Sequence, residues 1–283
     1  MHSEDNWDNV ILPKKSLFTI NFKEIWKYKD LLFMFVKRDF VTLYKQTVLG
    51  PIWFFLQPIF TTIIYVFVFG NVAKLSTDGS PKILFYMSGI VLWNYFAECF
   101  NKTATVFKDN QNIFGKVYFP RLITPLSIVT SSLLRLSIQF MLFLIVLGYY
   151  VLFQSYQVDF NIQLLLLPLL ILLMAAISLG FGLIITSLTT KYRDLVFLLQ
   201  FGVQLLMYAT PVIYPLSSLP DKYRWIIELN PMTSIIETFR YGIMGSGSFS
   251  CNNLIYTTVF AFFIVSIGTL VFNKTERKFM DTV

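Results

Sequence analysis

The sequence predicts an all-α integral membrane protein with six transmembrane helices. Of its 283 residues, 55% are hydrophobic and only 14% are charged, and the mean hydropathy is +0.63, whereas soluble domains carry about 25% charged residues. A hydrocarbon core of about 30 Å needs about 20 mostly apolar residues per helix. Six stretches meet this requirement, roughly 52–70, 83–100, 123–152, 163–188, 195–214 and 254–272.

The segment before the first span predicts an amphipathic helix that lies in the cytoplasmic interface. Residues 22–45 place apolar side chains at near-helical spacing and most Lys and Arg elsewhere, but their apolar core, 31–36, is too short to cross a bilayer. The alternative is a soluble helix packed on the same protein, which is disfavoured because no soluble domain is large enough to receive it. Gly50 and Pro51 then predict a corner, since Gly gives backbone freedom and Pro suits the first turn of a helix.

Lys and Arg orient the spans. The polar start MHSEDNWDNV does not resemble a cleaved signal peptide. With the N-terminus in the cytoplasm, 17 Lys and Arg lie inside and 5 outside, in agreement with the positive-inside rule, and both termini are cytoplasmic. The five outer residues are Lys74, Lys82, Lys222, Arg224 and Arg240. We treat the chain as one transmembrane domain (1–283) with a cytoplasmic tail (1–21), the interfacial helix (22–45), the six-span region (46–272) and a second cytoplasmic tail (273–283).

Several function classes are disfavoured by what the sequence lacks. The only histidine is His2, the two cysteines predict no disulfide framework, and no Walker pattern is present, so we expect neither a catalytic residue, a metal site nor a cofactor in this chain. The net charge of +7 indicates cytoplasmic loops near anionic lipid rather than a nucleic-acid partner.

A few polar side chains fall inside the predicted spans. Glu98 and Arg135 are expected to pair with each other, and the alternative is that Arg135 lines a pathway for an anionic substrate. Gln200 and Gln204 are four residues apart and share a helix face, which favours bonds to a neighbouring helix over a water-facing pathway.

Aromatic residues gather in the outer halves of the first two spans. An interfacial belt is the default interpretation, although aromatic rings toward a pore would also suit a passing sugar chain.

The connector between the last two spans, residues 211–250, contains four prolines and two short apolar helical patterns that cannot cross a bilayer. Asn230 and Pro231 predict a turn and a helix start. Irregular backbone at membrane depth is normally buried in protein or lines a cavity. We therefore predict short re-entrant helices that cap an exit pathway on the outer face.

Four segments together resemble the transmembrane subunit of type-2 ABC exporters for polysaccharides. They are KRDFVTLYKQTVLGPIWFFLQPI, IFGKVYFPRLITPLSIV, TTKYRDL and TPVIYPLSSLPDKYRWIIELNPMTSIIETFRYGI, and their order along nearly the whole chain makes the resemblance specific. It implies a homodimer in the bacterial inner membrane with a separate cytoplasmic ATPase that binds ATP and Mg. The cargo implied is an undecaprenyl-pyrophosphate-linked glycan, with O-antigen as the first choice. The alternatives are another cargo (teichoic acid, a lipid or a drug) and a partner-free channel or secondary carrier, which the lack of a convincing internal repeat disfavours.

The resemblance also implies roles for particular residues. The entrance, where a lipid pyrophosphate would arrive, carries Arg38, Lys45, Thr47, Leu49, Gly50, Trp53 and Arg121, although each cation is equally explained as a positive-inside residue that meets lipid. Channel candidates are Tyr65, Trp93, Tyr95, Arg135, Gln200 and Gln204. Coupling to the ATPase is expected at Asn110, Phe114, Lys116 and Arg121, and the outer gate at Pro211, Tyr214, Pro215, Asn230 and Pro231.

Overall fold

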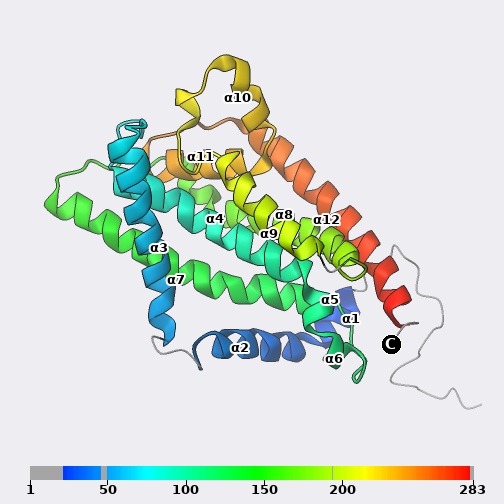
Figure 1. Cartoon of the computed structure of the whole chain (residues 1–283). Coiled ribbons are helices and arrows are strands. Elements are labelled where there is room, and N and C mark those ends of the chain that lie inside the picture. Colours follow the sequence, from blue (N-terminus) through cyan, green and yellow to red (C-terminus); the bar gives the residue numbers. More distant parts are fainter. Residues whose placement is uncertain (1–21, 46–49, 193, 281–283) are drawn as a thin grey trace, which may run out of the picture.

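The computed structural model in Figure 1 describes residues 22–45, 50–192 and 194–280. Within these residues every regular element is helical, which confirms the predicted all-α class. In chain order the elements are α1 (Phe22–Lys27), α2 (Lys29–Lys45), η1 (Gly50–Ile52), α3 (Trp53–Tyr65), η2 (Val66–Val72, a π-helix), α4 (Lys82–Ala104), α5 (Val106–Asp109), α6 (Gln111–Phe114), α7 (Ile123–Phe153), η3 (Ile162–Leu166), α8 (Leu167–Thr189), α9 (Leu195–Tyr208), η4 (Leu216–Ser218), α10 (Asp221–Glu228), α11 (Pro231–Met244) and α12 (Cys251–Met280).

Five helical segments of the described chain are long and apolar enough to cross a membrane, and each coincides with a predicted span. They are Trp53–Val72, Lys82–Ala104, Ile123–Phe153, Ile162–Thr189 and Cys251–Glu276. The last helix is longer than expected, because α12 continues to Met280, into the segment that we expected to be a cytoplasmic tail.

The remaining predicted span, 195–214, is shorter than the sequence suggested. Its helix α9 has 14 residues and ends at Tyr208, which gives a length of about 21 Å. The chain then turns, and the carbonyl oxygens of Pro211 and Val212 accept hydrogen bonds from Arg240 rather than from a continuing helix. The prediction that this helix reaches residue 214 is therefore wrong. The length of the apolar stretch in the sequence does not show where the helix ends.

Helix α4 is the centre of the bundle. It is the most buried of the five long helices, and α3, α7, α8, α9 and α11 all contact it. Its neighbour α8 packs tightly against α12 on the other side. A Cβ atom on Gly268 would lie 2.5 Å from the carbonyl oxygen of Gly180. The two backbones therefore approach as closely as small residues in membrane helices allow.

Different short helices lie at the two ends of the molecule. Figure 1 shows α1, α2, α5 and α6 at one end, near the end of α12, and α10 at the opposite end, above α11. A second hydrophobic cluster, separate from the main core, holds the first of these ends together. It consists of Phe35, Val106, Phe107, Phe114, Phe119, Ile123, Ile128, Leu183 and Phe272.

This second cluster changes the interpretation of α2. Figure 1 shows α2 lying below α7 and beside the lower end of α3, as expected for an interfacial helix, and α2 contacts α7. Phe35 of α2 is buried and packs edge-on against Phe119 at 5.7 Å, while Phe33, Met34 and Trp26 are exposed. The helix also packs on the same protein, as in the disfavoured alternative, because one side of α2 lies on the cluster; what receives it is the helical bundle and not a separate soluble domain. The other side of α2 presents apolar residues, as a helix at a lipid surface does.

Candidate functional site

The corner between α2 and α3 is built on glycine. Gly50 adopts φ +52°, in the left-handed region where residues with a Cβ are strained, and η1 then leads into α3. The ring of Phe40 on α2 lies 6.2 Å from the ring of Phe54 on α3, so the two helices contact each other beside the corner. Trp53 is half exposed there. The candidates Thr47 and Leu49 lie outside the described residues.

Three charged side chains, Glu98, Lys102 and Arg135, meet next to this corner, and we call them the inner cluster. Arg135 Nη1 lies 2.7 Å from Glu98 Oε2, and Lys102 Nζ lies 2.6 Å from Glu98 Oε1. The predicted pairing of Glu98 with Arg135 is therefore confirmed. The guanidinium of Arg135 also lies over the ring of Phe54, 4.9 Å from its centroid, which places it at the level of the first turn of α3.

The three cations that the sequence suggested for the entrance have different surroundings. Arg38 is paired with its neighbour Asp39 at 2.8 Å and stacks on Phe35. Lys45 is exposed at the end of α2. Arg121 is buried, lies over the ring of Phe114, and faces Glu276 of α12 with its Nε 4.0 Å from Oε1.

Burial lowers the pKa of Arg121, and the charge of Glu276 acts in the opposite direction. An arginine stays charged under such a shift because its usual pKa is so high.

The residues expected to couple to the ATPase form a compact end of the molecule. Asn110 is buried and donates from Nδ2 to the Val106 carbonyl at 3.0 Å, and Phe114 packs in the second cluster. After α6 the chain is exposed, and Lys116, Val117 and Tyr118 all point outward. Within the described residues, this end therefore offers a basic and partly apolar surface on a firmly packed base.

The channel candidates are divided between the core and the surface. Trp93 and Tyr95 are buried in the core around α4, and Tyr65 donates to the sulfur of Met207 at 3.5 Å. Neither Trp93 nor Tyr95 faces an open passage in this conformation. Gln200 and Gln204 are instead exposed on α9, so the bonds to a neighbouring helix that we expected are absent within the described chain. A role in a channel stays a prediction for all six candidates, Arg135 included.

At the opposite end, Arg240 forms a site that the sequence interpretation missed. We had placed Arg240 among the outer loop cations, yet its side chain is fully buried. It donates from Nη1 to the Pro211 carbonyl at 2.6 Å, from Nη2 to the carbonyls of Val212 and Phe85 at 2.9 and 3.2 Å, and from Nε to Ser88 Oγ at 3.2 Å. Its guanidinium also lies 3.7 Å from the centroid of the Phe85 ring.

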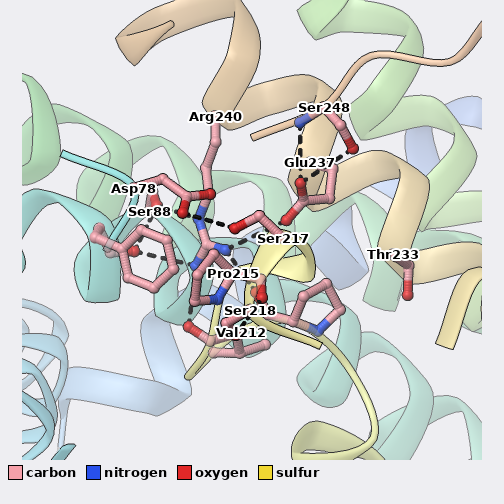
Figure 2. Close-up of polar contacts among 12 residues, drawn as sticks. Asp78, Ser88, Val212, Pro215, Ser217, Ser218, Thr233, Glu237, Arg240 and Ser248 are labelled. Carbon is pink, nitrogen blue, oxygen red and sulfur yellow. Dashed lines mark hydrogen bonds and ion pairs between the residues drawn. The ribbon is translucent and has the colours of Figure 1, made fainter. Parts of the chain in front are cut away.

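Two carboxylates complete this outer cluster, which we define as Asp78, Glu237 and Arg240 with the groups that they bind. Figure 2 shows Glu237 pointing toward Ser248 and Asp78 toward Ser217. Glu237 Oε2 accepts from the Ser248 amide at 3.0 Å, and Asp78 Oδ1 accepts from Ser217 Oγ at 2.7 Å. The cluster thus ties three loops to α4 and α11.

Burial lowers the pKa of Arg240 to about 10, which leaves it charged at neutral pH, and it raises the pKa of Glu237. The neighbouring guanidinium acts against that rise.

One signal in the sequence could have revealed Arg240. It lies three residues after Glu237 within an apolar helical segment, where a solvent-facing cation would be unusual. Gly89 on α4 makes room for the arginine, since a Cβ atom there would lie 2.9 Å from Arg240 Nη2, but the sequence alone does not show this. Small residues that make room for a partner are recognisable only when that partner is known.

The outer gate candidates lie in the turn after α9 or, at the start of α11, next to it. Pro211 supplies an acceptor carbonyl, Pro215 is buried, and Tyr214 donates to the Tyr208 carbonyl at 3.1 Å. Asn230 caps α11, since its Oδ1 accepts from the Met232 amide at 3.0 Å, and Pro231 is the first residue of that helix. The predicted turn and helix start are confirmed. Residues 211–218 are thus held by Arg240, which binds the Pro211 carbonyl, and by Asp78, which binds Ser217.

The described residues contain no group of three or more His, Cys, Asp or Glu side chains that could hold a metal ion. The chemistry that they offer is ion pairing, hydrogen bonding and aromatic contact at two ends of a helical bundle.

Comparison with known proteins agrees with this architecture. The family profile described as "ABC-2 type transporter" matches residues 30–244, which include the corner, the inner cluster and the outer cluster. The chain belongs to the ABC-2 type transporter family. Relatives of this ABC-2 protein include the O-antigen export system permease protein RfbA of Klebsiella pneumoniae, which is 28% identical over 253 residues, 89% of this chain and 94% of that protein.

Two further relatives of the ABC-2 protein come from other organisms. A protein with the same name from Myxococcus xanthus is 27% identical over 220 residues, 77% of this chain and 82% of its own. The polysialic acid transport protein KpsM of Escherichia coli is 22% identical over 250 residues, 87% of this chain and 93% of its own. The similarity therefore extends over most of the length of each protein, and this ABC-2 protein is a multi-pass membrane protein.

Proposed function

We propose that this chain is the permease subunit of an ATP-driven exporter that moves an undecaprenyl-pyrophosphate-linked polysaccharide, with O-antigen as the first choice, out of the cytoplasm. The observation that carries the proposal is the alignment with an O-antigen export permease over 89% of this chain and 94% of the relative. An alignment of that extent includes the corner and both charged clusters. A shared fold by itself would support only the transporter class.

The proposed arrangement is a homodimer in the bacterial inner membrane with both termini in the cytoplasm. A separate ATPase subunit binds ATP and Mg, and it docks on the end that contains α5, α6 and the exposed residues 115–118. Two observations support this docking site: the surface is exposed, and the aromatic residues beneath it are packed. A push on a packed cluster moves it as a unit, whereas a push on a loose loop would be absorbed locally.

The permease subunit performs no covalent chemistry in this proposal. ATP binding and hydrolysis in the partner favour one arrangement of the helices over another, since the two states differ in their contacts with the ATPase. The lipid-linked substrate enters beside the corner, and the segment 211–218 with α10 and α11 forms the outer gate.

A related ABC-2 permease with another cargo is the second candidate function. The 22% identity to a polysialic acid transport protein supports it, because that relative covers as much of the chain as the O-antigen permeases do. Teichoic acid, a lipid or a drug are further cargoes of this kind, and a channel or carrier without an ATPase is the remaining alternative.

The decisive experiment is purification of the tagged chain from its native membrane in mild detergent, followed by identification of bound proteins and lipids. We expect a stoichiometric ATPase with Walker motifs and a polyprenyl-linked glycan. Deletion of the gene should also leave that glycan on the cytoplasmic side. Recovery of a folded protein without an ATPase, repeated after crosslinking, would contradict the proposal.

A further inference from the structure

The inner cluster carries more positive than negative charge. Glu98 is the single carboxylate between two cations, with Arg135 on one of its oxygens at 2.7 Å and Lys102 on the other at 2.6 Å. The Glu98 side chain is 9% exposed, whereas those of Arg135 and Lys102 are 24% and 37% exposed. A buried carboxylate thus holds two cations that remain within reach of a ligand.

One donor of Arg135 has nothing to bind. Its Nε is buried and has no hydrogen-bond partner among the described residues. Buried donors are nearly always paired, so an unpaired one in a charged side chain indicates a missing partner. The ring of Phe54 lies over the guanidinium at 4.9 Å and shields it from solvent.

The position of the cluster matches the proposed entrance. From the sequence, Arg135 belongs to the interior of the third span. In the structure it contacts Phe54 in the first turn of α3, and Phe54 in turn contacts Phe40 of α2. The guanidinium therefore lies beside the α2–α3 corner, where a lipid headgroup at the cytoplasmic surface would meet it.

The other cations near the corner are less suited to an anionic ligand. Arg38 is already paired with Asp39, and Arg121 is buried between Phe114 and Glu276 at the end of α12. Lys45 is exposed, and a surface ammonium binds an anion weakly against water and salt. Among the described cations near the corner, those of the inner cluster alone combine two positive charges, partial shielding from water and an unpaired donor.

We propose that Arg135 and Lys102 bind the phosphate of a polyprenyl-linked lipid headgroup, and that Glu98 holds both cations in place until the phosphate replaces it. This inference rests on the proposed function, because it names the group in the lipid-linked substrate that the permease recognises. The planar guanidinium suits bidentate binding of a phosphate, and the ammonium adds a second charge-assisted contact. Phosphate entry moves Phe54 off the guanidinium, so binding shifts the first turn of α3.

The test measures binding of radiolabelled undecaprenyl pyrophosphate to the purified full-length chain in phosphatidylcholine nanodiscs. We expect Arg135→Gln to weaken binding about tenfold, as for loss of one charge-assisted contact, and Lys102→Gln to weaken it less because that side chain is more exposed. Glu98→Gln removes the competing carboxylate and should tighten binding. Arg135→Lys keeps the charge without the planar guanidinium, so its binding affinity should lie between that of Arg135→Gln and that of the unmodified protein.

The opposite effects expected for Glu98→Gln and Arg135→Gln on binding affinity distinguish a ligand site from a structural ion pair. If Glu98, Lys102 and Arg135 only stabilised the fold, Glu98→Gln and Arg135→Gln would weaken binding together, and that result would overturn the proposal. Unchanged affinity in Arg135→Gln would overturn it as well. The matched control is Arg224→Gln, which removes the same charge from an exposed i,i+4 pair with Glu228 on α10 and should leave binding unchanged.

Two further arms identify the source of the phosphate. Retention of the labelled lipid in an excess of phosphatidylglycerol supports a site for the substrate lipid, whereas equal competition, mole for mole, would assign the site to bulk lipid and overturn the proposal. Undecaprenol, which lacks phosphate, should not compete. Copurification of the ATPase is measured separately, so Arg135-dependent binding without an ATPase would contradict the proposed function and leave this site intact.

Discussion

The arginines of the two charged clusters differ in burial and in the number of their hydrogen-bond partners. At the outer end, Arg240 is fully buried and makes four hydrogen bonds to α4 and to the turn after α9. In the inner cluster, Arg135 is 24% exposed, shares its carboxylate with Lys102 and leaves its Nε without a partner within the described chain. Both lie beside an acid on the same or a neighbouring helix.

The difference indicates which arginine the fold needs and which one is available for binding. An arginine whose donors are satisfied by backbone carbonyls fixes those backbones in one arrangement, and it gains little from a ligand. An arginine with a shared acid and an open donor can exchange partners at low cost. The outer cluster is therefore a clamp, and the inner cluster is a site at which contacts change.

The largest effect is expected for Arg240→Ala. It leaves buried carbonyls at Phe85, Pro211 and Val212 and a buried carboxylate at Glu237 without their partner, which should lower the free energy of unfolding by about 3–5 kcal/mol. Thermal unfolding in detergent measures it. Arg224→Ala, at an exposed pair on α10, should stay within about 0.5 kcal/mol. A loss below about 1 kcal/mol for Arg240→Ala would show that the outer cluster is not a clamp.

A substitution between the two ends tests whether the rigidity extends along the bundle. Gly268→Ala would place a Cβ 2.5 Å from the Gly180 carbonyl oxygen, so α8 and α12 must separate, at a cost of about 1–3 kcal/mol. Gly148→Ala on α7 is the matched control, since nothing lies within 4 Å of its Cβ and alanine favours helix by up to about 1 kcal/mol. Equal stability of the two variants would mean that the α8–α12 contact is loose.

The inner cluster is tested by a double-mutant cycle with Glu98→Gln and Arg135→Gln. We expect a coupling of about 1–2 kcal/mol in thermal stability, smaller than the loss for Arg240→Ala because Lys102 still neutralises Glu98 when Arg135 is removed. When Lys102→Gln is added to this cycle, the thermal stability should depend more strongly on Arg135. A coupling near zero would show that the two side chains do not meet in the membrane.

The smallest effect is expected at the helix cap beside the outer cluster. Asn230→Ala removes the acceptor for the Met232 amide and the bond from Nδ2 to Thr210 Oγ1, and it should cost about 1 kcal/mol. Asn230→Asp keeps the acceptor and should recover most of that loss. If alanine and aspartate behaved alike, the acceptor for the Met232 amide would contribute nothing to stability. Asn112→Ala, at an exposed position on α6, serves as the neutral control.

The spans were predictable because their length and apolar character are local properties of the chain. Which of these helices is the most buried could not be predicted. Helix α4 is the least apolar of the five long helices and yet the most buried, because hydropathy reports contact with lipid rather than contact with protein. The short α9 could not be foreseen either, since its end depends on Arg240, which lies 29 residues beyond Pro211.

The candidate site residues divide in the same way. The Glu98–Arg135 pair and the Asn230 cap followed from rules about polar groups in membranes and at helix starts, and both are confirmed. The position of Arg135 beside Phe54 depends on how α3 crosses α7, and no sequence spacing encodes that crossing. Arg240 was misplaced because the positive-inside rule counts loop charges and cannot recognise a cation whose hydrogen-bond partners lie between 28 and 155 residues away.

The second hydrophobic cluster has a consequence for how the protein is made. Phe107 stacks on Phe272 at 4.8 Å, and Arg121 contacts Glu276, so the base beneath α5 and α6 is completed by residues of α12, which are synthesised long after it. These two contacts cannot form until α12 is inserted. This end of the bundle is therefore assembled only after α12 is inserted, and a chain cut before Phe272 would expose aromatic residues of the second hydrophobic cluster to chaperones and proteases.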